Sequence, residues 1–189
     1  ENTIGKELGV SRTPVREAVI QLSEESRIIE IFPQRGMRIA PIDVELVEEA
    51  RSLRVLLEKQ IAGMCCEMAT EEDIKWLQEN VGLQEFYMEN SRPEMVMQLD
   101  DEMHHKLFMI CHRELTYGMC QKLAIHYDRI RSLSVNTVKD NTIIEDHRKI
   151  IQFIAEHKKE NAMAQMEKHL SRWQLNEGKF RQEFPDYFK

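Results

Sequence analysis

The chain has 189 residues, of which 42% are hydrophobic and 31% charged, and its formal net charge is -7 at pH 7. This composition is typical of soluble globular proteins, and the length is enough for a small domain and one of ordinary size. We expect no membrane span and no signal peptide, because no apolar run approaches the roughly 20 residues that cross a bilayer. The four cysteines lack zinc-finger spacing, so we expect reduced core thiols in a cytoplasmic protein: Cys65, Cys66, Cys111 and Cys120.

The negative charge is unevenly distributed along the chain. Residues 1–40 contain six Lys or Arg and six Glu, whereas residues 41–189 contain twenty basic and twenty-seven acidic residues. The acidity therefore belongs to the second part of the chain. It does not exclude nucleic-acid binding by the first part, where local basic residues on the reading face decide the interaction.

Residues 9–18, with the sequence GVSRTPVREA, carry the first informative pattern. Gly9 suits the tight turn after a short helix, Ser11 or Thr13 can cap the next helix, and Pro14 falls in its first turn. One apolar stripe then follows with helical spacing at Val15, Ala18, Val19 and Leu22. Two short helices, a turn with Gly, and Arg and Thr at the start of the second helix predict a DNA-reading helix-turn-helix. The alternative is an ordinary helical hairpin with solvated arginines.

Residues 28–39 resemble a short β-hairpin in their pattern. A β-rich apolar run over 28–32 is followed by the turn Pro-Gln-Arg-Gly and a second short strand over 37–39. Gly36 lets the backbone approach DNA closely, and Arg35 suits a narrow, electronegative groove. The hairpin therefore has the features of the wing of a winged helix.

The chain after the hairpin is expected to be helical throughout. Residues 41–43 form the predicted linker, Asp43 is a candidate N-cap, Thr70 begins a capping box, and Pro93 suits a first helical turn. The pattern predicts six helices, over 44–68, 71–89, 93–111, 115–134, 142–157 and 161–182. We therefore predict a mostly α protein: an N-terminal winged helix-turn-helix over 1–40, a linker over 41–43, and an antiparallel six-helix bundle over 44–189.

Four ionisable residues interrupt the apolar stripes of three bundle helices. Asp100 and His104 lie in the stripe of the third helix, His147 in that of the fifth, and His169 in that of the sixth. A buried unpaired charge costs roughly several kcal/mol, so these groups need partners. Three imidazoles and a carboxylate suit Zn²⁺, Ni²⁺, Mn²⁺ or Fe²⁺ better than Ca²⁺. The alternative is a set of hydrogen-bonded core residues without a metal, and His126 is a reserve ligand.

Residues 9–18 and the Pro-Gln-Arg-Gly turn resemble the winged helix of GntR-family bacterial transcription regulators over residues 1 to about 40. The resemblance implies that DNA is contacted by Ser11, Arg12, Thr13, Arg16, Arg35 and Gly36. The chain departs from the family pattern in three places. It opens without the family's first helix, so we expect the start to be incomplete. Asn2 stands where an Arg often contacts phosphate, and residues 25–27 lack the usual Gly.

The predicted bundle resembles the FCD ligand domain of the FadR-type branch of the GntR family. Residues 100–104 are similar to its Asp-x-x-Phe-His motif, with Met in place of Phe, and 147–151 and 166–170 are similar to its two later histidine motifs. The resemblance implies the metal ligands Asp100, His104, His147 and His169. A first-helix Arg-x-x-x-Glu signature makes Arg54 a candidate to hold a ligand carboxylate, with an intrahelical pair to Glu58 as the alternative. Arg131 is a second candidate for the same role.

Together these features predict a DNA-binding transcription regulator, by default a repressor, that acts on a double-stranded operator. A small organic acid would enter the bundle, bind the metal ion, and shift the spacing of two recognition helices. We expect a cytoplasmic protein without membrane association. We also expect a homodimer, because paired half-sites lie about 34 Å apart on DNA. The alternatives are a metal-dependent hydrolase-like enzyme and a DNA-binding protein whose metal is purely structural.

Overall fold

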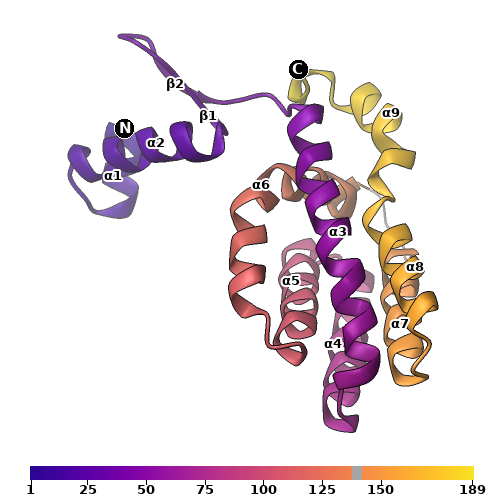
Figure 1. Cartoon of the computed structure of the whole chain (residues 1–189). Coiled ribbons are helices and arrows are strands. Elements are labelled where there is room, and N and C mark those ends of the chain that lie inside the picture. The colour runs from indigo at the N-terminus through magenta and orange to yellow at the C-terminus, as the bar shows by residue number, and fades with distance from the viewer. Residues whose placement is uncertain (138–141) are drawn as a thin grey trace.

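Figure 1 shows the computed structural model, which describes residues 1–137 and 142–189, without the side chains of 134–137, 173, 175 and 176. The described residues form nine α-helices, one short 3-10 helix and one two-stranded sheet. A small N-terminal part that contains the sheet lies beside one end of a bundle formed by the other helices. No helix in the described ranges is long and apolar enough to cross a membrane.

The N-terminal part, which we call the reading head, confirms the predicted winged helix-turn-helix. Its elements are α1 (Asn2–Leu8), α2 (Arg12–Ser26), β1 (Ile29–Phe32) and β2 (Gly36–Ile39). The two strands are antiparallel, with Ile29 opposite Ile39 and Phe32 opposite Gly36. Val15 and Val19 are the buried residues of α2, and Arg16, which is rotated by about 100° from Val15 around the helix axis, is exposed.

The turns of the reading head use left-handed backbone conformations. Gly9 ends α1 with a φ of 67°, as the sequence predicts for a helix stop. Arg27 ends α2 with a φ of 54°, so this non-glycine residue adopts the conformation that a Gly would take more easily. Ser11 is the N-cap of α2, but its side chain makes no capping hydrogen bond, which leaves the hydroxyl free to bind another group.

The bundle begins with three helices whose ends follow the predicted caps: α3 (Val44–Met68), α4 (Glu71–Glu89) and α5 (Pro93–Ile110). The Asp43 carboxylate accepts from the Glu45 N–H at the start of α3. Thr70 and Asp73 form a complete capping box at the start of α4. Pro93 occupies the first turn of α5. These local interactions explain why the sequence predicted the bounds of the three helices to within one residue.

The second half of the bundle differs from the prediction in one respect. It contains α6 (Glu114–Thr137), α7 (Thr142–Ala155), α8 (Lys159–Leu170) and α9 (Trp173–Glu183), followed by η1 (Pro185–Tyr187). The prediction of a single helix over 161–182 is therefore wrong, because the helix is interrupted between α8 and α9. The Leu170 carbonyl accepts from the Tyr127 hydroxyl at 2.9 Å, and the Gln174 N–H bonds to the Ser171 carbonyl instead. A contact from another helix thus replaces a hydrogen bond of the continuous helix.

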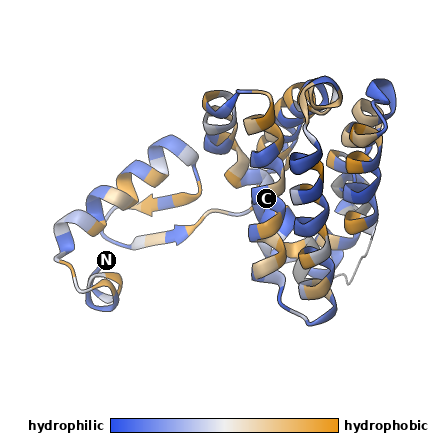
Figure 2. Ribbon diagram, turned by 90° about the horizontal axis from the view of Figure 1, so that it is seen from below, coloured by the Kyte–Doolittle hydropathy of each residue, from blue (hydrophilic) through white to orange (hydrophobic). Residues whose placement is uncertain are grey.

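Two apolar clusters hold the bundle together. The larger one joins the helices through buried residues such as Leu77, Met103 and Ile150, and Figure 2 shows the hydrophobic stretches that alternate with hydrophilic ones along the bundle helices. The smaller cluster lies at the end nearest the reading head and contains Ile42, Val47, Ala50, Tyr127, Ile130 and Phe180. Burial of this apolar surface stabilises the bundle where the chain enters it.

Residues 40–43, which we call the connecting segment, join β2 to α3. Ile42 is buried and forms a parallel bridge with Phe188. Its N–H donates to the Tyr187 carbonyl at 2.6 Å, and its carbonyl accepts from the Lys189 N–H at 3.0 Å. The connecting segment is therefore fixed to the last residues of the bundle.

Candidate metal centre and DNA-reading face

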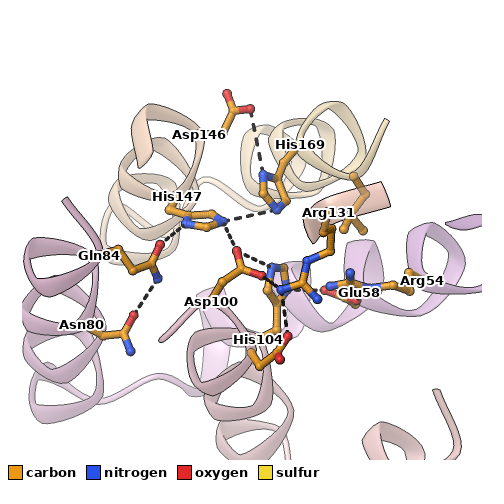
Figure 3. Close-up of polar contacts among 12 residues, drawn as sticks. Arg54, Glu58, Asn80, Gln84, Asp100, His104, Arg131, Asp146, His147 and His169 are labelled. Atoms are coloured by element: carbon orange, nitrogen blue, oxygen red, sulfur yellow. Dashed lines mark hydrogen bonds and ion pairs between the residues drawn. The ribbon is translucent and has the colours of Figure 1, made fainter. Parts of the chain in front are cut away.

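The four predicted metal ligands meet inside the bundle (Figure 3). Asp100 and His104 extend from α5, His147 from α7 and His169 from α8. One donor atom from each residue lies within 4.8 Å of the other three, and all four residues are buried. The structure thus brings together residues that are up to 69 positions apart in the sequence, from Asp100 to His169.

The separations between donor atoms match a single ion. His147 Nε2 lies 3.2 Å from Asp100 Oδ1 and 3.3 Å from His169 Nε2, and His104 Nε2 lies 3.9 Å from Asp100 Oδ1. Donors that bind one transition-metal ion at about 2.1 Å lie about 3 to 4 Å from one another. The arrangement therefore needs little rearrangement to bind such an ion.

Neighbouring polar side chains orient each imidazole. The Nδ1 atom of His147 lies 2.8 Å from Gln84 Oε1, and Gln84 Nε2 donates to Asn80 Oδ1 at 2.7 Å. If Gln84 accepts from Nδ1, the lone pair on His147 Nε2 faces the cluster. His104 Nδ1 lies in ion-pair contact with the Glu58 carboxylate. Such outer partners fix the tautomer and orientation of metal-binding histidines.

His169 and Asp100 also have outer partners. His169 Nδ1 lies 4.0 Å from Asp146 Oδ2, and Asp146 itself accepts from Gln165 at 2.6 Å and from Arg172. Asp100 Oδ2 pairs with Arg131. A polar or charged side chain thus lies near each predicted ligand on the side away from the centre, although His169 Nδ1 forms no hydrogen bond with the described residues.

The electrostatics favour the protonation states that bind a metal. Burial lowers the pKa of His147, and burial with the neighbouring imidazoles holds the pKa of His169 well below its ordinary value. Burial alone would raise the pKa of Asp100, but the charge of Arg131 outweighs it and keeps that pKa well below the usual range. Neutral imidazoles and an ionised carboxylate are the states that metal binding requires, so few protons must leave at neutral pH.

The residues present fit a transition-metal ion by a second criterion. His104 Nε2 is buried and has no hydrogen-bond partner among the described residues. A buried nitrogen without a partner costs about 1 to 3 kcal/mol, and it calls for an explanation such as an ion. Three imidazole nitrogens with one carboxylate oxygen suit Zn²⁺, Ni²⁺, Mn²⁺ or Fe²⁺.

We expect the metal-free protein to lose stability as the pH falls below about 6.5, the pKa of an unfolded histidine. Because the pKa values of His147 and His169 are lower in the folded state, the unfolded state binds protons first as the pH falls, and the free energy of unfolding decreases as the pH decreases. The loss is about 1.4 kcal/mol for each unit by which a pKa is lowered. Urea unfolding between about pH 8 and pH 5 measures it. A constant free energy of unfolding over this range would contradict the prediction.

The two candidate effector arginines are buried beside the cluster and already paired. Arg54 Nε lies 2.5 Å from Glu58 Oε1, the intrahelical pair that the sequence left open, and its guanidinium lies over the Tyr127 ring. Burial alone would raise the pKa of Glu58, but Arg54 and His104 hold it at about 2. Arg131 contacts three carboxylates: those of Asp100, Asp101 and Asp128.

The predicted DNA contacts gather on one face of the reading head. Arg12, Arg16, Arg35 and Gly36 line a groove of about 630 Å³ between α2 and the wing. Ser11 and Thr13 are exposed beside it at the start of α2. Arg12 pairs with Glu1 at 2.6 Å. Within the described ranges, neither Arg16 nor Arg35 has an ion pair. Both guanidinium groups are therefore available to phosphate or base edges.

The wing turn has the geometry that its sequence predicts. The Arg35 N–H donates to the Phe32 carbonyl at 3.0 Å, Gln34 has a φ of 61° and Gly36 a φ of 104°. Positive φ at Gly36 is readily adopted only by glycine. The turn therefore presents Arg35 at its tip.

Sequence reasoning missed the outer partners and misjudged His126. Gln84 and Asn80 are buried polar residues in the apolar stripe of α4, so the criterion that selected the ligands would have selected them also. The reserve ligand His126 is not part of the cluster. Its ring lies near Ser23 and Arg27 at the end of α2, because it faces the reading head rather than the bundle interior.

A winged helix-turn-helix joined to an all-helical domain defines a DNA-binding transcriptional regulator. Residues 49–172 match the FCD domain, and the chain belongs to this family, as a GntR-type transcriptional regulator. The resemblance predicted from the sequence is confirmed.

Similar proteins support this assignment. The HTH-type transcriptional repressor RspR of Escherichia coli (strain K12) is 28% identical over 189 residues, which is 100% of this chain and 82% of that protein. The Nta operon transcriptional regulator of Aminobacter aminovorans is 25% identical over 173 residues, 91% of this chain and 80% of its own. A Streptococcus agalactiae GntR structure is 25% identical with a TM-score of 0.53 and covers 89% of this chain and 84% of its own. E. coli McbR/YncC, at 17% identity, shows the shared fold with a TM-score of 0.78 over 97% of this chain and 86% of its own.

Proposed function

We propose that this regulator is a cytoplasmic repressor that binds a divalent transition metal and a small organic acid in its helical bundle, and that the acid controls operator binding. The buried cluster of Asp100, His104, His147 and His169 is the observation that carries the proposal. An ion held there supplies positive charge for the carboxylate of the acid. The relatives are named as transcriptional regulators, which agrees with the expectation that the chain is not an enzyme.

In the bundle, Arg54 is the residue that we assign to the acid. Its guanidinium is buried within one turn of Glu58, which contacts the ligand His104, so it lies next to the cluster. A carboxylate that displaces one contact with Glu58 would bind the guanidinium in the bidentate geometry that arginine favours. We assign Arg131 a secondary part, because three carboxylates already bind it.

At the DNA, the recognition helix α2 would place Arg12 and Arg16 in the major groove. Arg35 and Gly36 of the wing would approach the neighbouring DNA backbone or the minor groove. Ser11 and Thr13 would bind phosphate through their hydroxyls, because phosphate contacts fix the register of a protein on the duplex. The groove that these residues line supports the assignment.

Titration of operator DNA with and without a panel of organic acids tests the proposal. We expect one class of acid to change the operator affinity of the metal-loaded protein by about 5- to 150-fold. Arg54→Lys keeps the charge beside Glu58 but loses the bidentate fork, so this variant should respond only at higher acid concentration. An operator affinity that no acid changes would favour a purely structural metal instead.

We further propose that two copies of the chain pair through α6. An exposed apolar stripe on this helix contains Leu115, Met119 and Leu123, with exposed fractions of 89%, 71% and 40%. Gly118 lies in the same stretch, and a Cβ atom there would meet nothing in its own chain. Glycine inside a helix costs about 1 kcal/mol relative to alanine, so a close approach by another helix would explain its presence. In an antiparallel pair centred near Met119, Leu115 would face Leu123 of the partner subunit.

Met119→Glu is expected to convert the dimer into a monomer, because it places two like charges at the centre of the paired helices. Size-exclusion chromatography with light scattering measures the mass. Leu83→Glu on α4 is the matched control, because Leu83 is also an exposed apolar residue, 48% exposed, but lies on another helix. If Leu83→Glu gave the monomer while Met119→Glu stayed dimeric, the α6 interface would be wrong.

A further inference from the structure

The side of α6 that faces the reading head binds the connecting segment. Arg129 Nη2 donates to the Ala40 carbonyl at 2.7 Å, and its Nη1 donates to the Pro41 carbonyl at 3.4 Å. These two carbonyls belong to the residues that follow β2 directly. One guanidinium therefore bridges the bundle to the segment from which the reading head extends.

Arg129 is a charged residue that binds neutral carbonyls in place of a carboxylate. In the part of the chain that the structure describes, no carboxylate lies within ion-pair distance of it, and burial lowers its pKa. An arginine that is partly buried without an acidic partner gives up hydration for hydrogen bonds to neutral carbonyls. A fork of planar donors is well suited to hold two successive carbonyls in a fixed orientation.

The other side of the same helix contacts the cluster of predicted metal ligands. Arg131, two residues further along α6, pairs with the predicted ligand Asp100. Consecutive residues of a helix are rotated by about 100°, so positions 129 and 131 point about 200° apart. A rigid helix thus contacts the cluster with one arginine and the connecting segment with the other.

The reading head has room to change its position. Besides the contacts of Arg129, His126 of α6 lies near Ser23 and Arg27 at the end of α2. A cleft of about 650 Å³ lies beside these contacts, lined by residues of the head, the connecting segment and α6 such as Arg27, Ala40 and His126. Few contacts and an adjacent cleft are the conditions for a rigid-body rotation about a short hinge.

We infer that Arg129 is a positioning residue, which couples the occupancy of the metal site, through Arg131 and α6, to the placement of the reading head. The inference rests on the proposed function. An ion at Asp100 Oδ1 would withdraw negative charge from the carboxylate whose Oδ2 pairs with Arg131, so the attraction between this carboxylate and α6 would weaken. Arg129 transmits the resulting movement of α6 to the connecting segment, and the recognition helix moves with it.

Distance measurements between two spin labels test this inference without an operator. The labels are attached at Glu24→Cys on α2 and Glu72→Cys on α4, both exposed, whereas the four native cysteines are buried. Pulsed electron resonance is recorded on the full chain with Zn²⁺ and with a chelator, and metal content is measured on the same samples. Arg129→Ala, Arg129→Lys and Lys122→Ala, an exposed position of the same helix, are compared in this labelled background.

We expect Zn²⁺ to shift the distance by about 2 Å or more in the labelled parent chain and in Lys122→Ala. Arg129→Ala should retain stoichiometric metal but show a broad distance distribution that Zn²⁺ does not shift. Arg129→Lys should restore part of the shift, because lysine donates to one carbonyl at a time. This partial rescue would distinguish positioning from a general loss of folding.

Two results would overturn the inference while leaving the metal site intact. One is an Arg129→Ala protein whose distance shifts as much as that of the parent. The other is a parent chain that binds Zn²⁺ stoichiometrically without any shift. A parent chain that binds no Zn²⁺ would instead overturn the proposed function and this inference with it.

Discussion

Replacing His147 and His169 together with alanine is expected to abolish metal binding and the response to organic acids. The change removes two of four donor atoms and leaves Asp100 and His104, which both extend from α5. Two ligands from one helix do not form the closed donor set that transition metals bind tightly. Mass spectrometry of the purified protein should show a fall from stoichiometric metal to background, while the operator affinity no longer depends on any acid.

A matched control removes two other histidines. His105 and His112 lie outside the cluster, so the double variant His105→Ala, His112→Ala loses as many imidazoles without touching the centre. It should retain its metal. Circular dichroism of both variants checks that the helices persist, because the removal of two buried rings leaves a cavity that costs about 2 to 5 kcal/mol for each large side chain. Stoichiometric metal in the His147, His169 variant would refute the assignment of the site.

Arg16→Ala is expected to weaken operator binding by about 5- to 150-fold, which corresponds to about 1 to 3 kcal/mol for a base contact. Arg16 is exposed on α2 and lines the groove between the recognition helix and the wing. Its guanidinium lacks an ion pair within the described ranges, so no internal contact is lost with it. Fluorescence anisotropy with labelled operator at constant salt measures the affinity, since salt alone changes it strongly.

Arg148→Ala provides the comparison for Arg16→Ala. Arg148 is also exposed, but it lies on α7 and pairs with Glu85 of α4, far along the chain from the reading head. This variant should bind operator as the parent does, and both variants should contain the same amount of metal. If Arg148→Ala weakened binding as much as Arg16→Ala, the loss would reflect total charge rather than a contact of the recognition helix.

The sequence predicted the helices best where the caps are local. Asp43, Thr70 and Pro93 stabilise the starts of α3, α4 and α5 through residues within three positions, so the necessary information lies beside each helix. The wing was predictable for the same reason, because its turn depends on Pro33 and Gly36. Local chemistry of this kind does not require knowledge of the rest of the fold.

The break between α8 and α9 was not predictable in this way. No Gly or Pro marks residues 170–173. The interruption depends on the Tyr127 hydroxyl, which binds the Leu170 carbonyl from another helix, and on Arg172, which pairs with Asp146 of α7. Both contacts exist only after the helices pack, so helical periodicity alone extends through the break.

The candidate site was predictable in its ligands but not in its full environment. The four predicted ligands stand out as ionisable groups in apolar stripes, and the structure brings all of them together: Asp100, His104, His147 and His169. The sequence left a pair of Glu58 with Arg54 as one of two alternatives, and the structure contains this pair. The second contact of Glu58, with His104, depends on the packing of α3 against α5, so the residues near Glu58 in the sequence do not predict it.

The bridge between Ile42 and Phe188 has a practical consequence for protein engineering. It places the entry and the exit of the helical domain side by side, and the reading head leaves from that one point. A module whose two ends meet can be transplanted as a unit. Fusing residues 42–189 behind the head of another regulator should therefore yield a chimaera in which the proposed effector-binding domain of this chain controls a foreign promoter.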